Sequence, residues 1–151
     1  MILPLRRAGP ADAPAVRTLS RAAYAPWVPL IGREPMPMTA DYDHAVRAHW
    51  VDLYEEDGEL IALIETIPQD DHLLIENVAV RPDRHNAGLG DALMRHAGAL
   101  AREAGLTELR LYTNGAFARN LAFYAKRGFT EISREPSKLG GTLVRFHRLL
   151  A

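Results

Sequence analysis

The stretch NVAVRPDRHNAGLGDALM, residues 77–94, decides the fold of this chain. A run of apolar and β-branched residues ends at a proline, a polar loop with two glycines follows, and apolar residues at helical spacing begin directly afterwards. The pattern predicts a strand, a glycine loop and a helix in direct succession. The first N–H groups of a helix have no intrahelical partner and carry partial positive charge, so this loop is a ready site for an anion.

Three kinds of phosphate site use such a loop, and the residues around Gly90 distinguish them. A Walker loop ends in Gly-Lys-Ser/Thr, but Asp91 follows Gly90, which excludes it. A dinucleotide fingerprint fits poorly, because Leu93 stands near the place of its third glycine and the next strand ends at Asn114 rather than a carboxylate. The neutral loop favours a pyrophosphate held by backbone amides alone, since Gly88 and Gly90 allow close approach. A tight turn without a ligand is the alternative.

Composition bounds the class of protein. The chain has 151 residues, 48% hydrophobic and 25% charged, which predicts one globular domain over residues 1–151. A formal charge of −1 and a pI of about 6.6 give no basic field for nucleic acid or an anionic membrane. The absence of cysteine excludes thiol catalysis and disulfides, and the six histidines show no ligand spacing, so no metal is expected. Without a signal peptide or a membrane-length apolar run, we expect a soluble cytoplasmic protein.

Strand and helix patterns alternate along the chain in a way that predicts an α/β (α+β) fold. Hairpins are expected over residues 49–67, turning at Asp57-Gly58, and over 129–150, turning at Gly140-Gly141. Consecutive hairpins and two crossover helices imply a mixed central sheet of about six or seven strands with helices on both faces. Further strands are expected at residues 2–8, 73–80 and 108–114, and helices at 10–25, 88–105 and 118–128. Residues 26–44, with four prolines, predict no long element, although a short helix near 39–49 is possible.

Two further positions suggest chemistry. Asn120 and Tyr124 lie four residues apart on a predicted helix and therefore share one face. The Tyr124 hydroxyl needs a partner if it is buried, and it either belongs to the core or points into a cleft. Glu76 interrupts the apolar strand LLIENVAV, and a buried carboxylate is costly unless it is paired or used. Pairing with an arginine is the structural alternative for Glu76.

Together these motifs resemble the GNAT superfamily, the Gcn5-related N-acetyltransferases, over roughly residues 73–129. VAVRPDRHNAGLGDALM resembles the acetyl-CoA loop of that family, usually written Arg/Gln-x-x-Gly-x-Gly/Ala, and NLAFYAKRGF resembles its later motif. The chain departs from the pattern at His85, where arginine or glutamine is usual, and at Asn86, which is often glycine; Arg84 lies one residue early. Because an amide cradle needs no particular side chain, pyrophosphate binding is still expected.

The resemblance implies an enzyme that uses acetyl-CoA as co-substrate and transfers the acetyl group directly to a primary amine of a small molecule or peptide. Tyr124 resembles the general acid that protonates the departing thiolate. Asn120 resembles the asparagine that orients the cofactor. Glu76 is a candidate base acting through water, or a clamp on the amine. The implied cofactor-binding residues are Val78, Ala79, Val80, His85, Asn86, Ala87, Gly88, Leu89, Gly90, Asp91, Asn114, Asn120 and Tyr124.

The proline-rich segment is the expected source of acceptor specificity. Its residues either line an acceptor pocket, with Arg33 pairing with a substrate carboxylate, or pack as plain core. The candidates are Tyr24, Trp27, Arg33, Met36, Met38 and Tyr42.

Two other functions compete with this one. The first is a CoA-binding regulator or sensor without turnover. The second is an acetyltransferase with a large protein or RNA partner, of which the near-neutral charge disfavours the RNA version. Nucleic acid and membrane partners are not expected, and a homodimer is possible.

Overall fold

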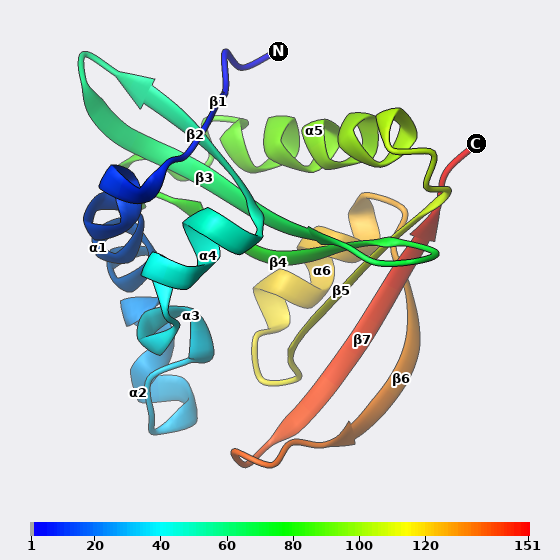
Figure 1. Cartoon of the computed structure of the whole chain (residues 1–151). Helices are drawn as coiled ribbons and strands as arrows, with labels where there is room; N and C mark the ends of the chain where they lie inside the picture. Colours follow the sequence, from blue (N-terminus) through cyan, green and yellow to red (C-terminus); the bar gives the residue numbers. More distant parts are fainter. Residues whose placement is uncertain (1) are drawn as a thin grey trace.

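The computed structural model describes residues 2–151 and confirms a mixed sheet with helices on both faces (Figure 1). Its seven strands lie in the order β1-β2-β3-β4-β5-β7-β6. All neighbours are antiparallel except β4 and β5, which run parallel. The strands are β1 (Arg6–Arg7), β2 (Trp50–Glu56), β3 (Glu59–Pro68), β4 (Leu73–Val80), β5 (Glu108–Asn114), β6 (Thr130–Pro136) and β7 (Thr142–Leu149).

The helices occupy the predicted segments. The proline-rich stretch holds only short elements, α2 and α3, before the predicted short helix near residues 39–49 appears as α4. The hairpin turn at Asp57 and Gly58 is also confirmed, since both residues have positive φ angles of 51° and 80°. The helices are α1 (Ala13–Tyr24), α2 (Val28–Ile31), α3 (Met36–Thr39), α4 (Tyr42–Ala48), α5 (Leu89–Glu103) and α6 (Ala118–Lys126). No helix within residues 2–151 has both the length and the apolar character needed to cross a membrane.

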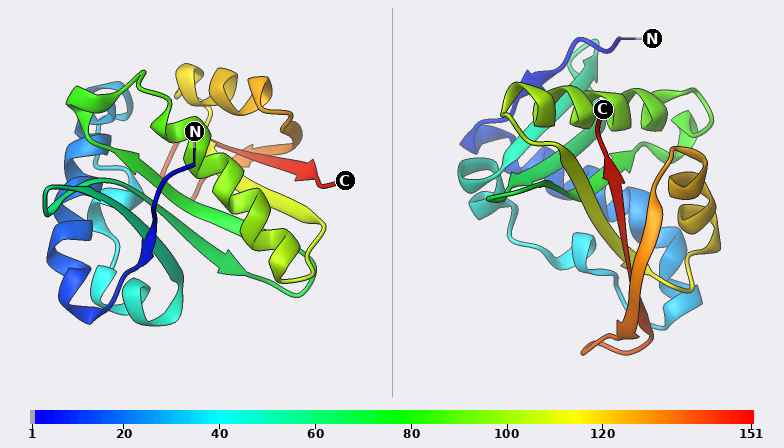
Figure 2. Two further views of the ribbon diagram at one scale, coloured as in Figure 1. Left: turned by 90° about the horizontal axis from the view of Figure 1, so that it is seen from above. Right: turned by 90° about the vertical axis from the view of Figure 1, so that its right-hand side faces the viewer.

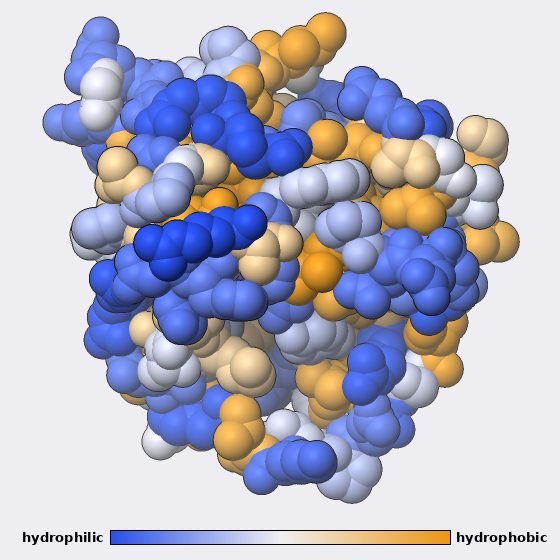
Figure 3. All heavy atoms as spheres, viewed as in Figure 1, coloured by the Kyte–Doolittle hydropathy of each residue, from blue (hydrophilic) through white to orange (hydrophobic). Residues whose placement is uncertain are grey.

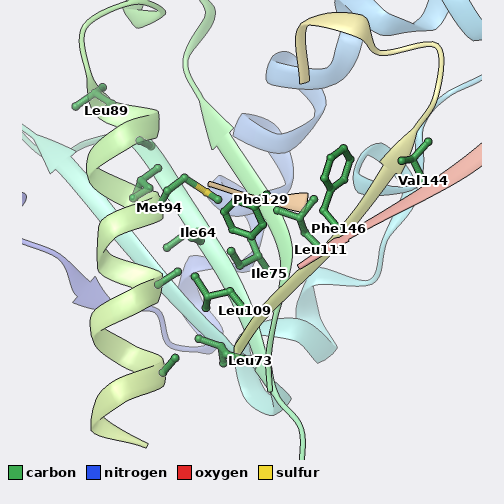
Figure 4. Close-up of a cluster of buried hydrophobic side chains, with 14 of the residues drawn as sticks. Ile64, Leu73, Ile75, Leu89, Met94, Leu109, Leu111, Phe129, Val144 and Phe146 are labelled. Atoms are coloured by element: carbon green, nitrogen blue, oxygen red, sulfur yellow. The ribbon is translucent and has the colours of Figure 1, made fainter. Parts of the chain in front are cut away.

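The sheet carries a hydrophobic core on each face. On one side α5 and α6 pack against β3, β4, β5 and β7, and Figure 4 shows Leu89 and Met94 of α5 with strand residues such as Ile64 and Leu109. On the other side α1 and α4 cover β2 and β3, so the sheet lies between two helical layers (Figure 2). Hydrophilic residues cover most of the face drawn in Figure 3, with apolar ones scattered among them.

Replacing Leu93 with alanine should destabilise the protein by about 2–5 kcal/mol, because this fully buried α5 residue would leave a cavity against the sheet. The same substitution at Leu149, which is 69% exposed, is the matched control and should change the free energy of unfolding by less than about 0.5 kcal/mol. Urea denaturation measures both variants, and equal losses would show that α5 does not hold this core.

Candidate functional site

Strands β4 and β5 are paired only at their beginnings. Leu73 lies opposite Leu109 and Leu74 opposite Arg110, and past these pairs the two strands diverge (Figure 1). On its far side β5 stays paired with β7 along its whole length. The opening therefore lies between the carboxyl-terminal halves of two neighbouring parallel strands, where α/β proteins commonly bind ligands.

A β-bulge in β4 lies where the separation begins. Asn77 pairs with Glu65 of β3 and Ile75 pairs with the next residue, Thr66, so Glu76 has no residue opposite it. A bulge adds one residue to its strand, bends it and strengthens its twist. The extra residue in this strand is thus the carboxylate that the sequence singles out.

The bulge also changes which side chains of β4 face which layer. Before it, Ile75 packs in the core beneath α5. After it, Ala79 packs in the core beneath α1, and the Asn77 amide donates a hydrogen bond to the Ser20 hydroxyl of α1 at 3.0 Å. The odd-numbered residues of β4 therefore face α5 before the bulge and α1 after it. Glu76, at the bulge itself, faces the opening between β4 and β5.

The backbone of β4 beyond the bulge offers an unpaired edge. The N–H of Arg81 bonds to a carbonyl of β3, and alternate residues of a strand turn to opposite edges, so Val78 and Val80 face the opening. Both of their carbonyls have side-chain contacts there. The Tyr24 hydroxyl donates to the Val78 carbonyl oxygen, and His85 Nε2 lies against the Val80 carbonyl oxygen, each at 3.2 Å.

The glycine turn presents free N–H groups at the end of that edge. Asn86 and Gly88 have positive φ angles of 66° and 82°, and α5 starts at Leu89 without any side-chain cap. A Cβ on Gly90 would lie 3.2 Å from the Phe123 ring of α6, so only glycine fits there without a shift. A cavity of about 360 Å³, the turn cavity, lies beside these residues. Its wall includes Val80, His85, Asn86, Gly88, Gly90, Arg119, Asn120 and Tyr124.

Arginines near the turn are partly engaged already. Arg84 lies one residue before His85, the position where the acetyl-CoA loop motif usually has arginine or glutamine. Arg84 pairs with Glu56 of β2 at 2.5 Å, so a carboxylate already holds this cation. Arg127, the residue that follows α6, pairs with Asp91 at 3.2 Å, which joins the end of α6 to the first turn of α5. Arg119 lines the cavity and has no ion pair within residues 2–151. The uncapped amides and this one cation fit a phosphate group.

Tyr124 and Asn120 of α6 line two cavities at once. The first is the turn cavity and the second, the strand cavity, occupies about 320 Å³ between β4 and β5. Burial raises the pKa of Tyr124 to about 12, so the phenol keeps its proton at neutral pH. Its hydroxyl has no hydrogen-bond partner within the described part of the chain, consistent with a tyrosine that points into a cleft. The strand cavity is lined in part by Arg33, Met36, His49, Glu65, Glu76, Tyr112 and Leu139.

Glu76 pairs with a phenol and not with an arginine. The Tyr112 hydroxyl of β5 donates to Glu76 Oε1 at 2.6 Å across the opening. Burial and this contact with the carboxylate both raise the pKa of Tyr112, so the phenol remains a donor. One carboxylate oxygen is therefore fixed, and Glu76 as a whole faces the strand cavity.

A second buried carboxylate in the same cavity escaped the sequence analysis. Glu65 of β3 is 4% exposed, and its Oε2 lies 2.6 Å from Nδ1 of His49, the residue that follows α4. Burial raises the pKa of Glu65 against the opposing effect of His49. The signal was present, because Glu65 interrupts the apolar run LIALIETI as Glu76 interrupts its own strand.

The other predicted residues divide between the cavities and the core. Trp27 lies in the turn cavity and contacts Phe117 with ring centroids 4.4 Å apart, whereas Arg33 lines the strand cavity. Met38 is buried core. Tyr42 is also fully buried but lines the strand cavity, with its hydroxyl bonded to the Pro37 carbonyl at 2.5 Å. Their role in acceptor binding stays a prediction.

Three predicted cofactor residues do not line the turn cavity. Ala79 is core, Ala87 is exposed, and Asn114 lines the strand cavity, where its side chain accepts a bond from the N–H of Ala116 at 2.9 Å. Their contact with a cofactor remains untested.

Comparison with known proteins identifies the family of the chain. Residues 15–129 match the model of a family described as the acetyltransferase (GNAT) family. The chain is 32% identical over 88 residues to streptothricin acetyltransferase of Streptomyces lavendulae, a match that covers 57% of this chain and 47% of that protein. The matched part thus spans about half the length of that curated relative.

Solved structures share the fold over nearly the whole chain. The PaiA N-acetyltransferase of Thermoplasma acidophilum, in complex with coenzyme A, has a TM-score of 0.78 at 16% identity and 99% coverage of both chains. The ribosomal-protein-S18-alanine N-acetyltransferase of Escherichia coli has a TM-score of 0.75 at 20% identity, covering 97% of this chain and 93% of its own. Since the family match runs from α1 through the glycine turn to the end of α6, the chain belongs to the acetyltransferase (GNAT) family.

Proposed function

We propose that this protein is an acetyl-CoA-dependent N-acetyltransferase that transfers the acetyl group directly to a primary amine of a small molecule or peptide. The observation that carries the proposal is the position of Tyr124, which lines both the turn cavity and the strand cavity. One cavity ends in free helix N–H groups, and the other contains carboxylates. Such a pair of sites suits an anionic cofactor and a cationic acceptor that meet at one phenol.

The residues of the turn cavity fit coenzyme A. The free N–H groups at the start of α5, around Gly88 and Gly90, would hold the pyrophosphate. The exposed edge at Val78 and Val80 would bind the pantetheine arm as an added strand. Arg119, which forms no ion pair within residues 2–151, would supply a cation on the cavity wall. The solved relative from Thermoplasma acidophilum contains coenzyme A, which supports this assignment.

The residues at the junction of the cavities would perform the transfer. When bound, acetyl-CoA supplies an activated acetyl carbon, and the acceptor nitrogen bonds to it as the carbon–sulfur bond breaks. Tyr124 donates its proton to the departing sulfur, a role that its pKa of about 12 permits because the phenol is protonated at neutral pH. A backbone N–H at the opened edge near Val78 polarises the acetyl carbonyl. Glu76, fixed by Tyr112, holds the acceptor ammonium.

The strand cavity favours an amine attached to an apolar body. Met36 and Leu139 are more than half exposed at its wall and offer apolar contact surface. Arg33 lies on the same wall and would pair with a carboxylate where the acceptor carries one. A panel of alkyl amines, amino acids and peptide N-termini, followed by free thiol release and by mass spectrometry of the acetylated product, identifies the acceptor. A CoA-binding regulator would release no thiol with any amine.

Coenzyme A and acetyl-CoA should raise the melting temperature, because a ligand of the native state stabilises it. At one hundred times Kd the gain is about 2.7 kcal/mol, or about 5 to 10 °C for a chain of this size. Gly88→Val should abolish this ligand-induced shift, since the side chain would occupy the space of the pyrophosphate. Differential scanning fluorimetry measures the shift.

Gly105→Val is the matched control for that experiment. Gly105 also has a positive φ, 75°, and it follows the opposite end of α5 with open space around it. Both variants suffer the same backbone strain, so both lose stability without ligand, but only Gly105→Val should keep the full shift. Equal shifts in the two variants would place the cofactor elsewhere.

Tyr124→Phe should lower kcat by about 10²-fold or more while Kd for coenzyme A changes little, because only the transferable proton is lost. Burst and steady-state assays of thiol release give kcat, and calorimetric titration with coenzyme A gives Kd. The variant keeps the ring that packs edge-on against Phe129, with centroids 5.9 Å apart, so the fold should survive. An unchanged kcat would exclude the phenol from the chemistry.

A further inference from the structure

A histidine–glutamate pair lies in the strand cavity and has no role in the reaction as described so far. His49 Nδ1 lies 2.6 Å from Glu65 Oε2, and the side chains are 21% and 5% exposed. Both residues line the same cavity as Glu76. Glu65 pairs across the strands with Asn77, the residue next to Glu76, so the two carboxylates lie on adjacent strands at the bulge.

The geometry of the pair fixes which nitrogen of His49 is available. A carboxylate accepts, so Nδ1 carries the hydrogen and Nε2 keeps its lone pair in neutral imidazole. Nε2 has no hydrogen-bond partner within residues 2–151. The His44 ring meets the His49 ring edge-on with centroids 5.6 Å apart, and His44 itself is exposed. The pair is thus a partly exposed imidazole held by a buried carboxylate, with a second, exposed imidazole against its ring.

We propose that His49, positioned by Glu65, accepts the proton that the acceptor ammonium must lose before it attacks; this inference rests on the proposed function. The ammonium gives one proton to Nε2 by way of water in the cavity, and the free amine then bonds to the acetyl carbon as the carbon–sulfur bond breaks. Tyr124 protonates the sulfur, and the second nitrogen proton returns to the Tyr124 oxygen. The proton on His49 leaves to solvent past His44, so one proton is released per turnover.

Glu76 is less suited to this task. It already accepts a hydrogen bond from Tyr112, and carboxylates are weak bases at neutral pH. Its charge serves better to hold the ammonium, while an imidazole changes its protonation in the range where enzymes work. Several other titratable or charged residues lie near the pair and interact with it electrostatically, and none of them except Glu76 is changed in the test below. These are His44, Glu76, Tyr24, Tyr42 and Tyr112 around Glu65, with Arg33 and Asp41 on the cavity wall.

The pH dependence of kcat/KM, measured with the best amine of the panel, tests the proposal. In the wild type kcat/KM should rise between about pH 5 and 8 as imidazole loses its proton. His49→Gln should remove this rise and lower kcat/KM by about 10²-fold. Glu65→Gln should also lower kcat/KM, and the double variant His49→Gln/Glu65→Gln should lose no more than His49→Gln alone, because Glu65 acts through His49. A purely structural role of Glu65 would make the two losses multiply.

His72→Gln is the matched control. His72 Nδ1 lies 2.6 Å from Asp71 Oδ1, the same separation as in the proposed pair, but His72 lies outside both cavities. This variant should keep the wild-type profile. Melting temperatures of all variants identify any that fails to fold. Where Glu65→Gln does not fold, the result for His49→Gln decides the test.

Two results would overturn the proposal. One is a His49→Gln variant that keeps the rise between pH 5 and 8, and the other is loss of that rise in Glu76→Gln instead, which would make Glu76 the base. Wild-type protein that releases no thiol with any amine refutes the proposed function instead.

Discussion

The separation of β4 from β5 is the constraint on which the rest of the site depends. Buried backbone N–H and C=O groups need partners, and past Leu74 the β5 side of β4 has no strand to supply them. The carbonyls of Val78 and Val80 are instead contacted by Tyr24 and His85. An edge of this kind is a site for an extended ligand, because such a ligand restores the missing strand.

The same separation explains why the glycine turn lies next to α6, the helix that carries Tyr124. The turn follows directly from the open edge of β4, and α6 follows directly from β5. Since the two strands diverge, their following helices lie on either side of the gap and touch through Gly90 and Phe123 and through Asp91 and Arg127. Glycine at position 90 is therefore as much a packing requirement between α5 and α6 as a feature of ligand approach.

Regular patterns made most of the fold predictable, and a local irregularity hid part of the site. The Asp57-Gly58 turn, the apolar stripe of α5 and the glycine loop all depend on short-range chemistry that the sequence displays. The bulge at Glu76 depends on the register between two strands, which no single segment encodes. The contact between Glu65 and His49 could not be predicted from the sequence for the same reason, because the two residues come from separate elements. The sequence does show that Glu65 and Glu76 each interrupt an apolar strand.

The proline-rich segment shows how little composition says about which residues reach a cavity. Met38 has the thioether character of a pocket residue but is buried and lines neither cavity, whereas Tyr42 lines the strand cavity with its hydroxyl already bonded to the Pro37 carbonyl. Arg33 and Met36, only a few residues away, line the strand cavity. The difference is the burial that short helices α3 and α4 create against the sheet. The proposed direct transfer would need both substrates bound at once, and the two cavities share Tyr24, Val78, Asn120 and Tyr124, as that proposal requires.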